Sequence, residues 1–505
     1  MLTILFTIGI IVRVFAFTSA PPGLNQDEAS IGYDAYSILH YGIDRNGSFL
    51  PIHLIAWGSG QNALYAYLSM PFIYLFGLNP FSIRIVSVLA GIVTLFLFHA
   101  IAKRLFNNNR ASIIAIFIVV ICPWHIMISR WALESNLFPT VVLLAVYFAV
   151  KSLDHPKWLF AFSVTMAISL YAYGTAYFFA PLFVLSVYVL LAVRKTASIR
   201  AILLNGVVFT IFSMPILLFI LINRYSSGAI EAIFTIPKLT KPRFEQTSTA
   251  FQSDLWTSSI HNFKQFMNIM VTQNDGLIWN AIPPFGYMYP IALPFILIGL
   301  VTMAGALTNR LNTVQAIVVL WFIVAVLMAF ITDVNINRIN IVFYPVLFFT
   351  VSGLLWLLQN DKWIGRIAIA AFTIFFLVFS ANYYTRFPDK ISAAFYESFG
   401  EAINYASEAT EGKVYITDRV NMPYIYVLTY EKINPHAFLD SVSYRNKGDA
   451  FQWVDSFGRY QFGQPQIHEG EQAAYLFANS EQMPEDESQF TFKRFKHYTV
   501  VTERQ

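Results

Sequence analysis

The stretch "PPGLNQDEASIGYDAYSILHYG", residues 21–42, follows an apolar run over residues 2–20 and places Asp27 directly beside Glu28. An apolar run of roughly 20 residues is long enough to cross a bilayer as a helix. The two carboxylates are therefore expected just beyond the end of a membrane helix. Their position raises the question of what adjacent acidic side chains do at the edge of a membrane.

The composition of the whole chain agrees with this first run. The 505 residues are 56% hydrophobic and only 12% charged, whereas soluble globular chains carry roughly 25% charged residues. The pattern predicts an α-helical polytopic membrane protein with about eleven transmembrane helices. The apolar runs that carry this prediction lie near residues 2–20, 81–102, 111–128, 137–151, 157–171, 175–193, 201–222, 287–307, 313–332, 339–358 and 364–383.

Basic residues collect in alternate loops between these runs. The loops at 103–110, 151–157, 194–200, 310 and 362–366 hold most of them. The intervening short loops hold only Arg130 and Arg338. Because lysine and arginine favour cytoplasmic loops, the N-terminus is predicted to be cytoplasmic. Residues 21–80, residues 223–286 and everything after 384 are then predicted to face outward.

The outward segments differ in character. Residues 385–505 are densely charged and contain the strand-like runs "KVYITD", "AAYLFA" and "HYTVVT", preceded by the helix-like "AAFYESFGEAINYASEA". Such runs predict a small extracytoplasmic α/β domain, separate from a membrane domain over residues 1–384. In the first outward loop, Pro71 and Gly77 are expected to break the apolar stretch "LYAYLSMPFIYLFGL", which would lie along the membrane interface.

Several classes of protein are disfavoured by the same sequence. The net charge is only +4 and the basic residues fall in short loops, so nucleic acid is not an expected partner. Cys122 is the single cysteine, so neither an intrachain disulfide nor redox chemistry is expected. The first residues, "MLTILF", lack a basic side chain, and Pro21 and Pro22 follow "TSA", which predicts a retained first helix. The absence of cysteine pairs and of a retention-type tail favours a bacterial plasma membrane.

The charged residues near the membrane have two readings each. Asp27 and Glu28 begin a short amphipathic stretch, where acids suit the positive end of a helix dipole. Alternatively, a carboxylate there is a general base for a hydroxyl that arrives from outside. Arg13 lies within the first apolar run. It either reaches the interface or an acid to stabilise the helix bundle, or lines the same cavity as the two carboxylates.

A family resemblance rests on the order of several motifs. Besides Asp27 and Glu28 in the first outward loop, these stretches are "NPFSIRIVSVLAG" (79–91), "CPWHIMISRWALESNLFPT" (122–140), "SLYAYGTAYFFAP" (169–181), "GLIWNAIPPFGYMYP" (276–290) and "NRINIVFYP" (337–345). In their order, the chain resembles membrane glycosyltransferases of the GT-C fold, in the group of the protein O-mannosyltransferases and aminoarabinose transferases. The resemblance covers residues 1–384.

This resemblance implies an inverting transfer of a sugar from a polyprenyl-phosphate donor to an extracytoplasmic acceptor. The acceptor is left open between protein Ser/Thr, a cell-wall polymer and a lipid-linked glycan. Asp27 would deprotonate the acceptor hydroxyl, and Glu28 would support it or bind sugar or acceptor. Arg84 matches a family arginine with a structural or acid-orienting role. Fixed cations can stabilise a leaving phosphate, and Arg130 is one candidate.

Arg338 is the other candidate cation at the predicted outer face. The alternative for these two arginines is a structural ion pair, Arg130 with Glu134 and Arg338 with Asp333. The candidate residues for binding the donor phosphate and sugar are therefore Arg130, Arg338, Arg84, Gln61 and Tyr173.

The first outward loop departs from the pattern of some relatives. It reads "WGSGQNALY" where they carry a basic residue, so Gln61 and Asn62 are the expected hydrogen-bonding groups. Tyr173, with Tyr171 and Tyr177, belongs either to an interfacial aromatic belt or to a sugar groove.

The spacing of the histidines bears on metal dependence. Some relatives use a divalent metal. Here His53, His125 and His261 are isolated in the sequence, so no obligate metal is predicted.

Two other classes of function fit a polytopic chain. A transporter or flippase for lipid-linked glycans also needs many helices, but it often shows internal repeats and interrupted helices, which this sequence lacks. A non-catalytic envelope protein could bind a cell-wall polymer through its outward domain. That protein would tolerate replacement of Asp27 and Glu28, whereas the enzyme would not.

Overall fold

The computed structural model describes residues 1–225, 228–242, 248, 254–305, 312–468 and 470–504. Part of the predicted outward loop 223–286, and Arg310 in a predicted cytoplasmic loop, lie outside these residues. The chain divides into two compact units. The helical unit comprises residues 1–15, 87–218 and 243–384. The mixed unit comprises residues 16–86, 219–242 and 385–505.

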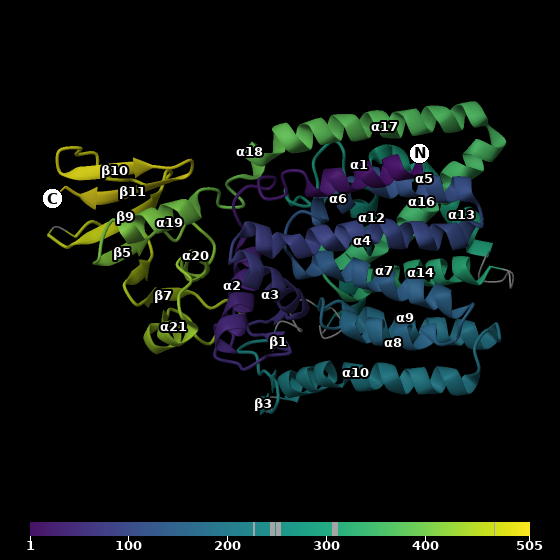
Figure 1. The fold of residues 1–505 in the computed structure, drawn as a ribbon, viewed down its shortest axis with the longest axis horizontal. Helices are drawn as coiled ribbons and strands as arrows, with labels where there is room; N and C mark the ends of the chain where they lie inside the picture. Colours follow the sequence, from purple (N-terminus) through teal and green to yellow (C-terminus); the bar gives the residue numbers. More distant parts are fainter. Residues whose placement is uncertain (226–227, 243–247, 249–253, 306–311, 469, 505) are drawn as a thin grey trace. The chain divides into compact units, whose positions relative to one another are not determined.

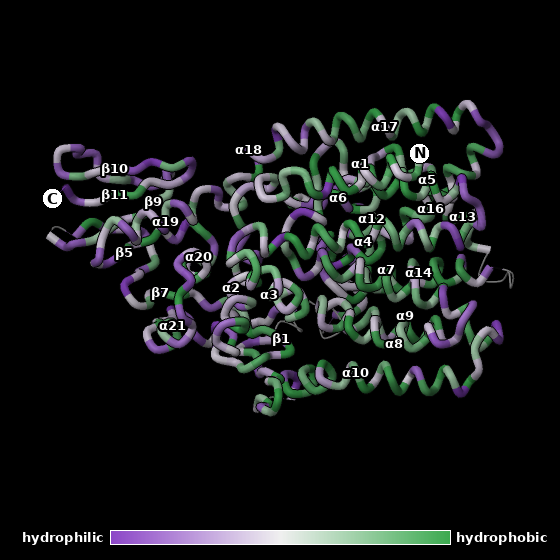
Figure 2. Tube along the Cα trace, in the orientation of Figure 1, coloured by the Kyte–Doolittle hydropathy of each residue, from purple (hydrophilic) through white to green (hydrophobic). Residues whose placement is uncertain are grey.

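The helical unit contains a helix for each of the predicted apolar runs, and Figure 2 shows that these helices are apolar along most of their length. Among the described residues, seven helices are long and apolar enough to cross a membrane, and the remaining runs form shorter apolar helices. The prediction of a helical polytopic membrane protein is confirmed. The helices are α1 (Leu2–Val14), α4 (Pro80–Phe106), α5 (Asn109–Ile121), α6 (Pro123–Ile128), α7 (Glu134–Ser152), α8 (Trp158–Ser169), α9 (Ala176–Val193), α10 (Ile199–Tyr225), α12 (Leu255–Thr272), α13 (Leu293–Ala304), α14 (Thr313–Ile331), α15 (Ile336–Ile339), α16 (Phe343–Asn360) and α17 (Lys362–Thr385). Helices α4, α10 and α17 also contribute residues to the mixed unit, namely 80–86, 219–225 and Thr385.

Two glycines allow a close contact between the backbones of α13 and α16. A Cβ atom at Gly299 would lie 1.8 Å from the carbonyl oxygen of Phe349, and one at Gly353 would lie 2.0 Å from the carbonyl oxygen of Phe295. The two backbones therefore touch, which small residues permit between membrane helices.

The mixed unit joins segments that are far apart in the sequence. Its elements are labelled in Figure 1 where there is room. They are α2 (Gln26–Tyr41), β1 (His53–Leu54), β2 (Gln61–Asn62), α3 (Leu64–Phe76), β3 (Ile230–Glu231), β4 (Thr235–Ile236), α18 (Phe387–Ile391), α19 (Phe399–Glu408), β5 (Lys413–Ile416), α20 (Pro423–Tyr430), α21 (Pro435–Ser441), β6 (Ser443–Tyr444), β7 (Val454–Phe457), β8 (Tyr460–Phe462), β9 (Ala473–Ala478), β10 (Phe490–Arg494) and β11 (Tyr498–Glu503).

Helix α2 packs against α20, which lies almost 400 residues later. The Tyr33 hydroxyl donates to the carbonyl oxygen of Ile433 at 2.7 Å, and the Tyr426 hydroxyl donates to that of Leu24 at 3.2 Å. The segment 219–242 belongs to the same unit. One of its contacts there is the stacking of the His53 ring on Phe219, at 4.2 Å between ring centroids. All three predicted outward segments thus contribute to one folded body.

A seven-stranded mixed sheet forms the C-terminal part of this unit. The strand order is β10-β11-β9-β5-β8-β7-β6, and β5 runs parallel to both of its neighbours while the other pairs are antiparallel. Figure 1 shows α19 beside these strands. The prediction of a sheet with helices in the C-terminal part of the chain is confirmed, because the three strand-like runs form β5, β9 and β11.

The prediction that Pro71 breaks the apolar stretch in the first outward loop is wrong. Helix α3 runs through Pro71 and ends before Gly77, which adopts φ 75°. Proline costs about 3 kcal/mol in a helix interior. Burial of Tyr65, Ala66 and Ile73 in the same helix offsets this cost.

Candidate active site

Helix α2 begins with a reciprocal capping arrangement that uses Glu28. The Asn25 side chain accepts a hydrogen bond from the backbone N–H of Asp27 at 3.0 Å. A carboxylate oxygen of Glu28 accepts one from the backbone N–H of Asn25, also at 3.0 Å. Such a capping box satisfies N–H groups that the first helical turn leaves without a partner. The capping alternative therefore holds for Glu28.

Glu28 also forms a two-pronged ion pair with Arg84, at the start of α4. Arg84 Nε donates to Glu28 Oε1 and Arg84 Nη2 donates to Glu28 Oε2, both at 2.7 Å. Both side chains are fully buried. The rest of the guanidinium donates to carbonyl oxygens of the chain just before α2, those of Pro21 and Gly23 at 2.7 Å each. With its donors engaged in this way, Arg84 fits the predicted acid-orienting role better than that of a phosphate ligand.

Asp27 is held differently from its neighbour. Adjacent helical residues point about 100° apart, and Asp27 is half-buried where Glu28 is fully enclosed. The Asp27 carboxylate acts on two tyrosines of the mixed unit: burial raises the pKa of Tyr396 and of Tyr426, and the charge of Asp27 raises both further. Asp27 is thus a partly accessible carboxylate near phenol groups that stay protonated at neutral pH.

Gln61 and Arg45 are joined by hydrogen bonds through Ser30 on helix α2. The Ser30 hydroxyl donates to Gln61 Oε1 at 2.9 Å, and Arg45 Nη2 donates to the Ser30 oxygen at 2.6 Å. Gln61 and Arg45 are buried. In this structure the predicted donor-site glutamine is therefore bound to protein groups next to the first turn of α2.

The chain of hydrogen bonds continues to a second group of buried charges, which sequence reasoning missed. The Asp34 carboxylate accepts from the backbone N–H of Arg45 at 3.1 Å and lies 3.6 Å from its guanidinium. That guanidinium lies 4.5 Å from the ring centre of Trp57. Burial raises the pKa of Asp34, and burial together with the Asp34 charge raises the pKa of Asp44 to about 7. The turn sequence "DRNG" after Gly42 was the available signal.

Arg130 and Arg13 belong to the helical unit. Arg130 Nη1 donates to the carbonyl oxygens of Val12 and Arg13, at 3.1 and 3.2 Å. These are the last carbonyls of α1, which a cation suits. The Arg13 guanidinium is fully buried and bonds to His125 Nδ1 and to the carbonyl oxygen of Gly9. Arg13 therefore stabilises the packing of α1, through a histidine and backbone carbonyls in place of the predicted acid or membrane interface.

Arg338 and Tyr173 also lie in the helical unit. Arg338 Nη1 donates to the Asp333 carbonyl oxygen at 3.1 Å and lies 3.4 Å from its carboxylate, as the structural alternative predicted. Its side chain keeps 18% of its surface exposed, whereas Arg84 and Arg130 are fully buried. Tyr173 is half-buried in the turn between α8 and α9, 6.4 Å from the ring of Phe138.

The histidines each have ordinary partners. His53 Nδ1 lies 3.0 Å from the Leu54 carbonyl oxygen, and His261 lies 3.0 Å from Gln265. Within the described ranges, no three His, Cys, Asp or Glu side chains form a group that could hold a metal ion.

The mixed unit therefore brings together Asp27, Glu28, Arg84 and Gln61, all on or beside the first turns of α2. Arg130, Arg338 and Tyr173 belong to the helical unit. Tyr396 and Tyr426, close enough for the Asp27 charge to act on them, had no signal in the sequence, because they lie far from Asp27 along the chain.

Comparisons with known proteins support this architecture. Residues 62–219 match the model of the family described as dolichyl-phosphate-mannose-protein mannosyltransferase. The matched stretch includes Arg84, Arg130 and Tyr173, and it begins after Asp27 and Glu28. The comparison with curated protein sequences found no match.

Solved structures of membrane enzymes share the fold. ArnT from Cupriavidus metallidurans bound to undecaprenyl phosphate matches with a TM-score of 0.55 and 11% identity, over 99% of this chain and 97% of that one. The apo Archaeoglobus fulgidus oligosaccharyltransferase matches with a TM-score of 0.51 and 12% identity, over 85% of this chain. The match spans 63% of that enzyme, less than two thirds of its length. The chain therefore has the GT-C fold of membrane glycosyltransferases, as the resemblance predicted.

Proposed function

We propose that this protein transfers a sugar from a polyprenyl-phosphate donor to a hydroxyl of an extracytoplasmic acceptor, with inversion and with Asp27 as general base. The observation that carries the proposal is the division of roles between two adjacent carboxylates. Glu28 is locked between Arg84 and the helix cap. Asp27 is held on the same rigid turn and stays partly accessible.

The chemistry follows from this arrangement. The acceptor oxygen attacks the anomeric carbon, its proton passes to the Asp27 carboxylate, and the polyprenyl phosphate leaves with the bonding electrons. A base must be held within hydrogen-bond reach of the proton that it accepts. The ion pair between Glu28 and Arg84 supplies that rigidity, because it fixes the helix turn and the chain before it.

A cation is needed where the phosphate leaves. We propose Arg338 for this contact, because it alone among the three predicted arginines keeps part of its side chain exposed. Its partner Asp333 is half exposed, so their ion pair is weak and exchangeable. The ArnT structure that shares this fold contains undecaprenyl phosphate, which supports a donor of this class.

The predicted orientation forms part of the proposal: N-terminus in the cytoplasm, mixed unit outside a bacterial plasma membrane. The mixed unit contains residues from each of the three segments that charge bias placed outside, namely residues 21–80, 223–242 and those after 384. Arg104 pairs with Asp154, so two loops that charge bias assigns to the cytoplasm lie next to each other. Both observations support the orientation.

The test is release of polyprenyl phosphate by the purified protein, offered a panel of undecaprenyl-phosphate sugars with membrane extract as acceptor. Asp27→Asn should lower the rate by about 10²–10⁴-fold, the usual contribution of a general base, with unchanged thermal unfolding. Asp440→Asn, an exposed acid on α21, is the matched control. Substantial turnover by folded Asp27→Asn protein would refute the base assignment. Transport of lipid-linked glycan without any release would favour the transporter alternative.

The donor contact has its own test. Arg338→Ala should raise the apparent KM for the donor with a smaller effect on the acceptor, because a lost charge-assisted hydrogen bond costs about 1.5–3 kcal/mol. Arg386→Ala, which removes an exposed arginine immediately before α18, is the control. An unchanged donor KM would exclude Arg338 from phosphate binding.

A further inference from the structure

A pocket of about 350 Å³ lies on the seven-stranded sheet, among residues with no role in the proposed chemistry. Its volume is within the range of small-molecule sites, about 300–1,000 Å³. Its lining comes from three adjacent strands, β5, β8 and β7, and from the loop that follows β8. Tyr415, Gln461 and Ser456 are register partners across these strands, so their side chains share one face of the sheet.

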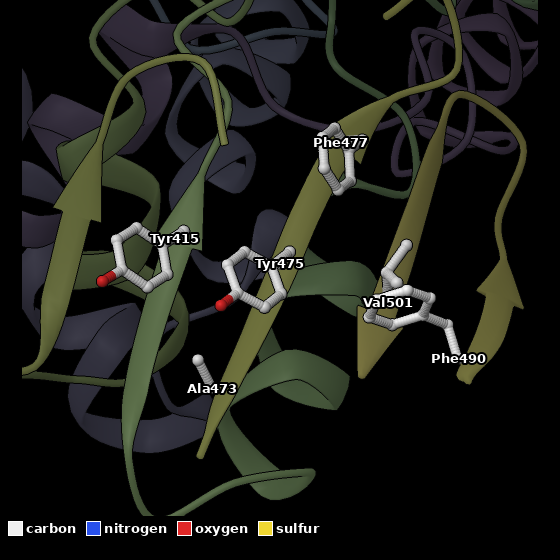
Figure 3. Close-up of a cluster of buried hydrophobic side chains, with 6 residues drawn as sticks. All are labelled: Tyr415, Ala473, Tyr475, Phe477, Phe490 and Val501. Atoms are coloured by element: carbon white, nitrogen blue, oxygen red, sulfur yellow. The ribbon is translucent and has the colours of Figure 1, made fainter. Parts of the chain in front are cut away.

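One wall of the pocket is held rigidly. The ring of Tyr415 stacks on that of Tyr475 at 5.1 Å between centroids and 8° between planes, and Figure 3 shows the two rings side by side with their hydroxyls directed the same way. The Tyr415 hydroxyl donates to Glu471 at 2.7 Å, and Glu471 is in turn paired with Lys413 at 2.9 Å. A wall ordered before binding lowers the entropic cost of binding.

The polar lining indicates what the pocket can bind. Gln461, Gln464 and Gln466 each present an amide that both donates and accepts hydrogen bonds. No lysine or arginine is among the described residues that line the pocket. Asp455 is already paired with Arg445 at 2.8 Å. Apart from the imidazole of His468, the described lining therefore offers no basic side chain to a phosphate or carboxylate ligand, and it suits a neutral ligand with many hydroxyl groups.

The position of the pocket disfavours an extended peptide. A peptide that binds by strand addition needs the free edge of a sheet. The edges here are β10 and β6, whereas the pocket lies over the interior strands β5 and β8 and over β7. A ring-shaped polar ligand can bind to the face of paired strands without displacing a backbone hydrogen bond.

We propose that this pocket, walled by Tyr415 and lined by Gln461, Gln464 and Gln466, binds a neutral oligosaccharide away from the reaction centre. Sugar rings offer an apolar face for the aromatic wall and paired hydroxyls for the side-chain amides. The site would hold a glycan portion of the acceptor. Saccharide binding itself does not require that Asp27 be the base.

The test is binding of neutral trisaccharides (maltotriose, mannotriose and chitotriose) to the full chain in lipid nanodiscs, so that no maltoside detergent competes. Saturation-transfer NMR and calorimetry should detect binding of at least one of them. Gln461→Leu and Gln464→Leu should each weaken binding by about threefold to tenfold, the cost of a lost neutral hydrogen bond. Gln489→Leu, at an exposed site outside the pocket, should leave binding unchanged.

One further measurement separates this site from the proposed catalytic one. Asp27→Asn protein should bind the trisaccharide as wild type does, even if it has lost turnover. An affinity unchanged from wild type in both glutamine variants would refute the proposal. So would binding of unstructured peptides but of none of the trisaccharides, or an absence of saccharide binding by the wild-type protein.

Discussion

Helix α2 carries two buried ion pairs that are built in opposite ways. Glu28 and Arg84 are satisfied on every side, with two direct contacts of 2.7 Å and further bonds to backbone groups. Asp34 and Arg45 lie 3.6 Å apart. Within the part of the chain that the structure describes, Asp34 Oδ2 and two nitrogens of Arg45 have no hydrogen-bond partner.

The difference between the two pairs is one of rigidity: the Glu28–Arg84 pair is rigid, and the Asp34–Arg45 pair is adjustable. A fully satisfied buried pair resists any change, because removal of one partner leaves a buried charge. A partly satisfied pair has already lost some of that stabilisation. Asp44, which lies beside the second pair, has a pKa near 7 and exchanges its proton in the physiological range. The rigid Glu28–Arg84 pair lies beside Asp27, where the proposed chemistry needs a fixed geometry.

The largest expected effect on stability comes from breaking the Glu28–Arg84 ion pair. Arg84→Met should lower the free energy of unfolding by about 3–5 kcal/mol, because Glu28 is left charged and buried. The double variant Glu28→Gln with Arg84→Met should recover part of this loss, because no bare charge remains. Thermal unfolding of all three proteins in nanodiscs measures the effect. A double variant no more stable than Arg84→Met would show that the guanidinium contacts to Pro21 and Gly23 matter more than the ion pair.

Removal of Arg45 should cost less than removal of Arg84. Arg45→Met should lower the free energy of unfolding by about 1–3 kcal/mol, because the pKa of Asp34 and of Asp44 is already raised and both can take up protons. The loss should shrink at lower pH, where protonation removes the repulsion between the carboxylates. An effect equal to that of Arg84→Met, or one independent of pH, would contradict the proposed contrast between the pairs.

The third effect is a dependence of stability on pH that originates from Asp44. Its pKa is raised from 3.8 to about 7 in the folded protein, so between these values the folded state binds the proton more tightly than the unfolded state. This contribution is greatest at pH values below 4 and is lost as the pH rises towards 7. In Asp44→Asn protein, unfolding temperatures measured from pH 5 to pH 7 should lack this component. An identical slope in wild type and variant would assign it to another group.

The smallest effect is expected at an exposed pair in the same unit. Arg445 and Asp455 lie 2.8 Å apart with about half of each side chain exposed. Arg445→Gln should change the free energy of unfolding by only about 0–1 kcal/mol, since solvent screens such pairs. The same unfolding measurement provides a baseline for the two buried pairs. A change in the free energy of unfolding larger than that of Arg45→Met would show that burial does not determine how much each ion pair contributes to stability.

Predictions from the sequence succeeded where a signal was local and repeated. Each apolar run forms a helix because the length and hydropathy of a run suffice to make it helical in a bilayer. The strands β5, β9 and β11 are also local, since their alternating or continuous apolar patterns mark half-buried and buried strands. Pro71 was misjudged because burial of the surrounding helix face outweighed a local preference.

Only part of the candidate site could be predicted from local signals in the sequence. The adjacent carboxylates Asp27 and Glu28 could be found from their position after a membrane helix, and Arg84 from a motif. The sequence could not show that Glu28 binds Arg84 while Asp27 lies near Tyr396 and Tyr426. Those partners are separated by 56 residues in the first case and by several hundred in the second.

The sequence by itself thus determined the membrane helices, their predicted orientation and the presence of a sheet domain. The reason is that the hydropathy and charge of a segment are set by its own residues and need no knowledge of distant contacts. The tertiary structure alone decided which of two neighbouring acids is enclosed, and it combined the first outward loop and residues 219–242 with the C-terminal sheet in one body. The physical reason is that burial depends on contacts made across the fold. Burial in turn controls the strength of an ion pair and the pKa of a carboxylate.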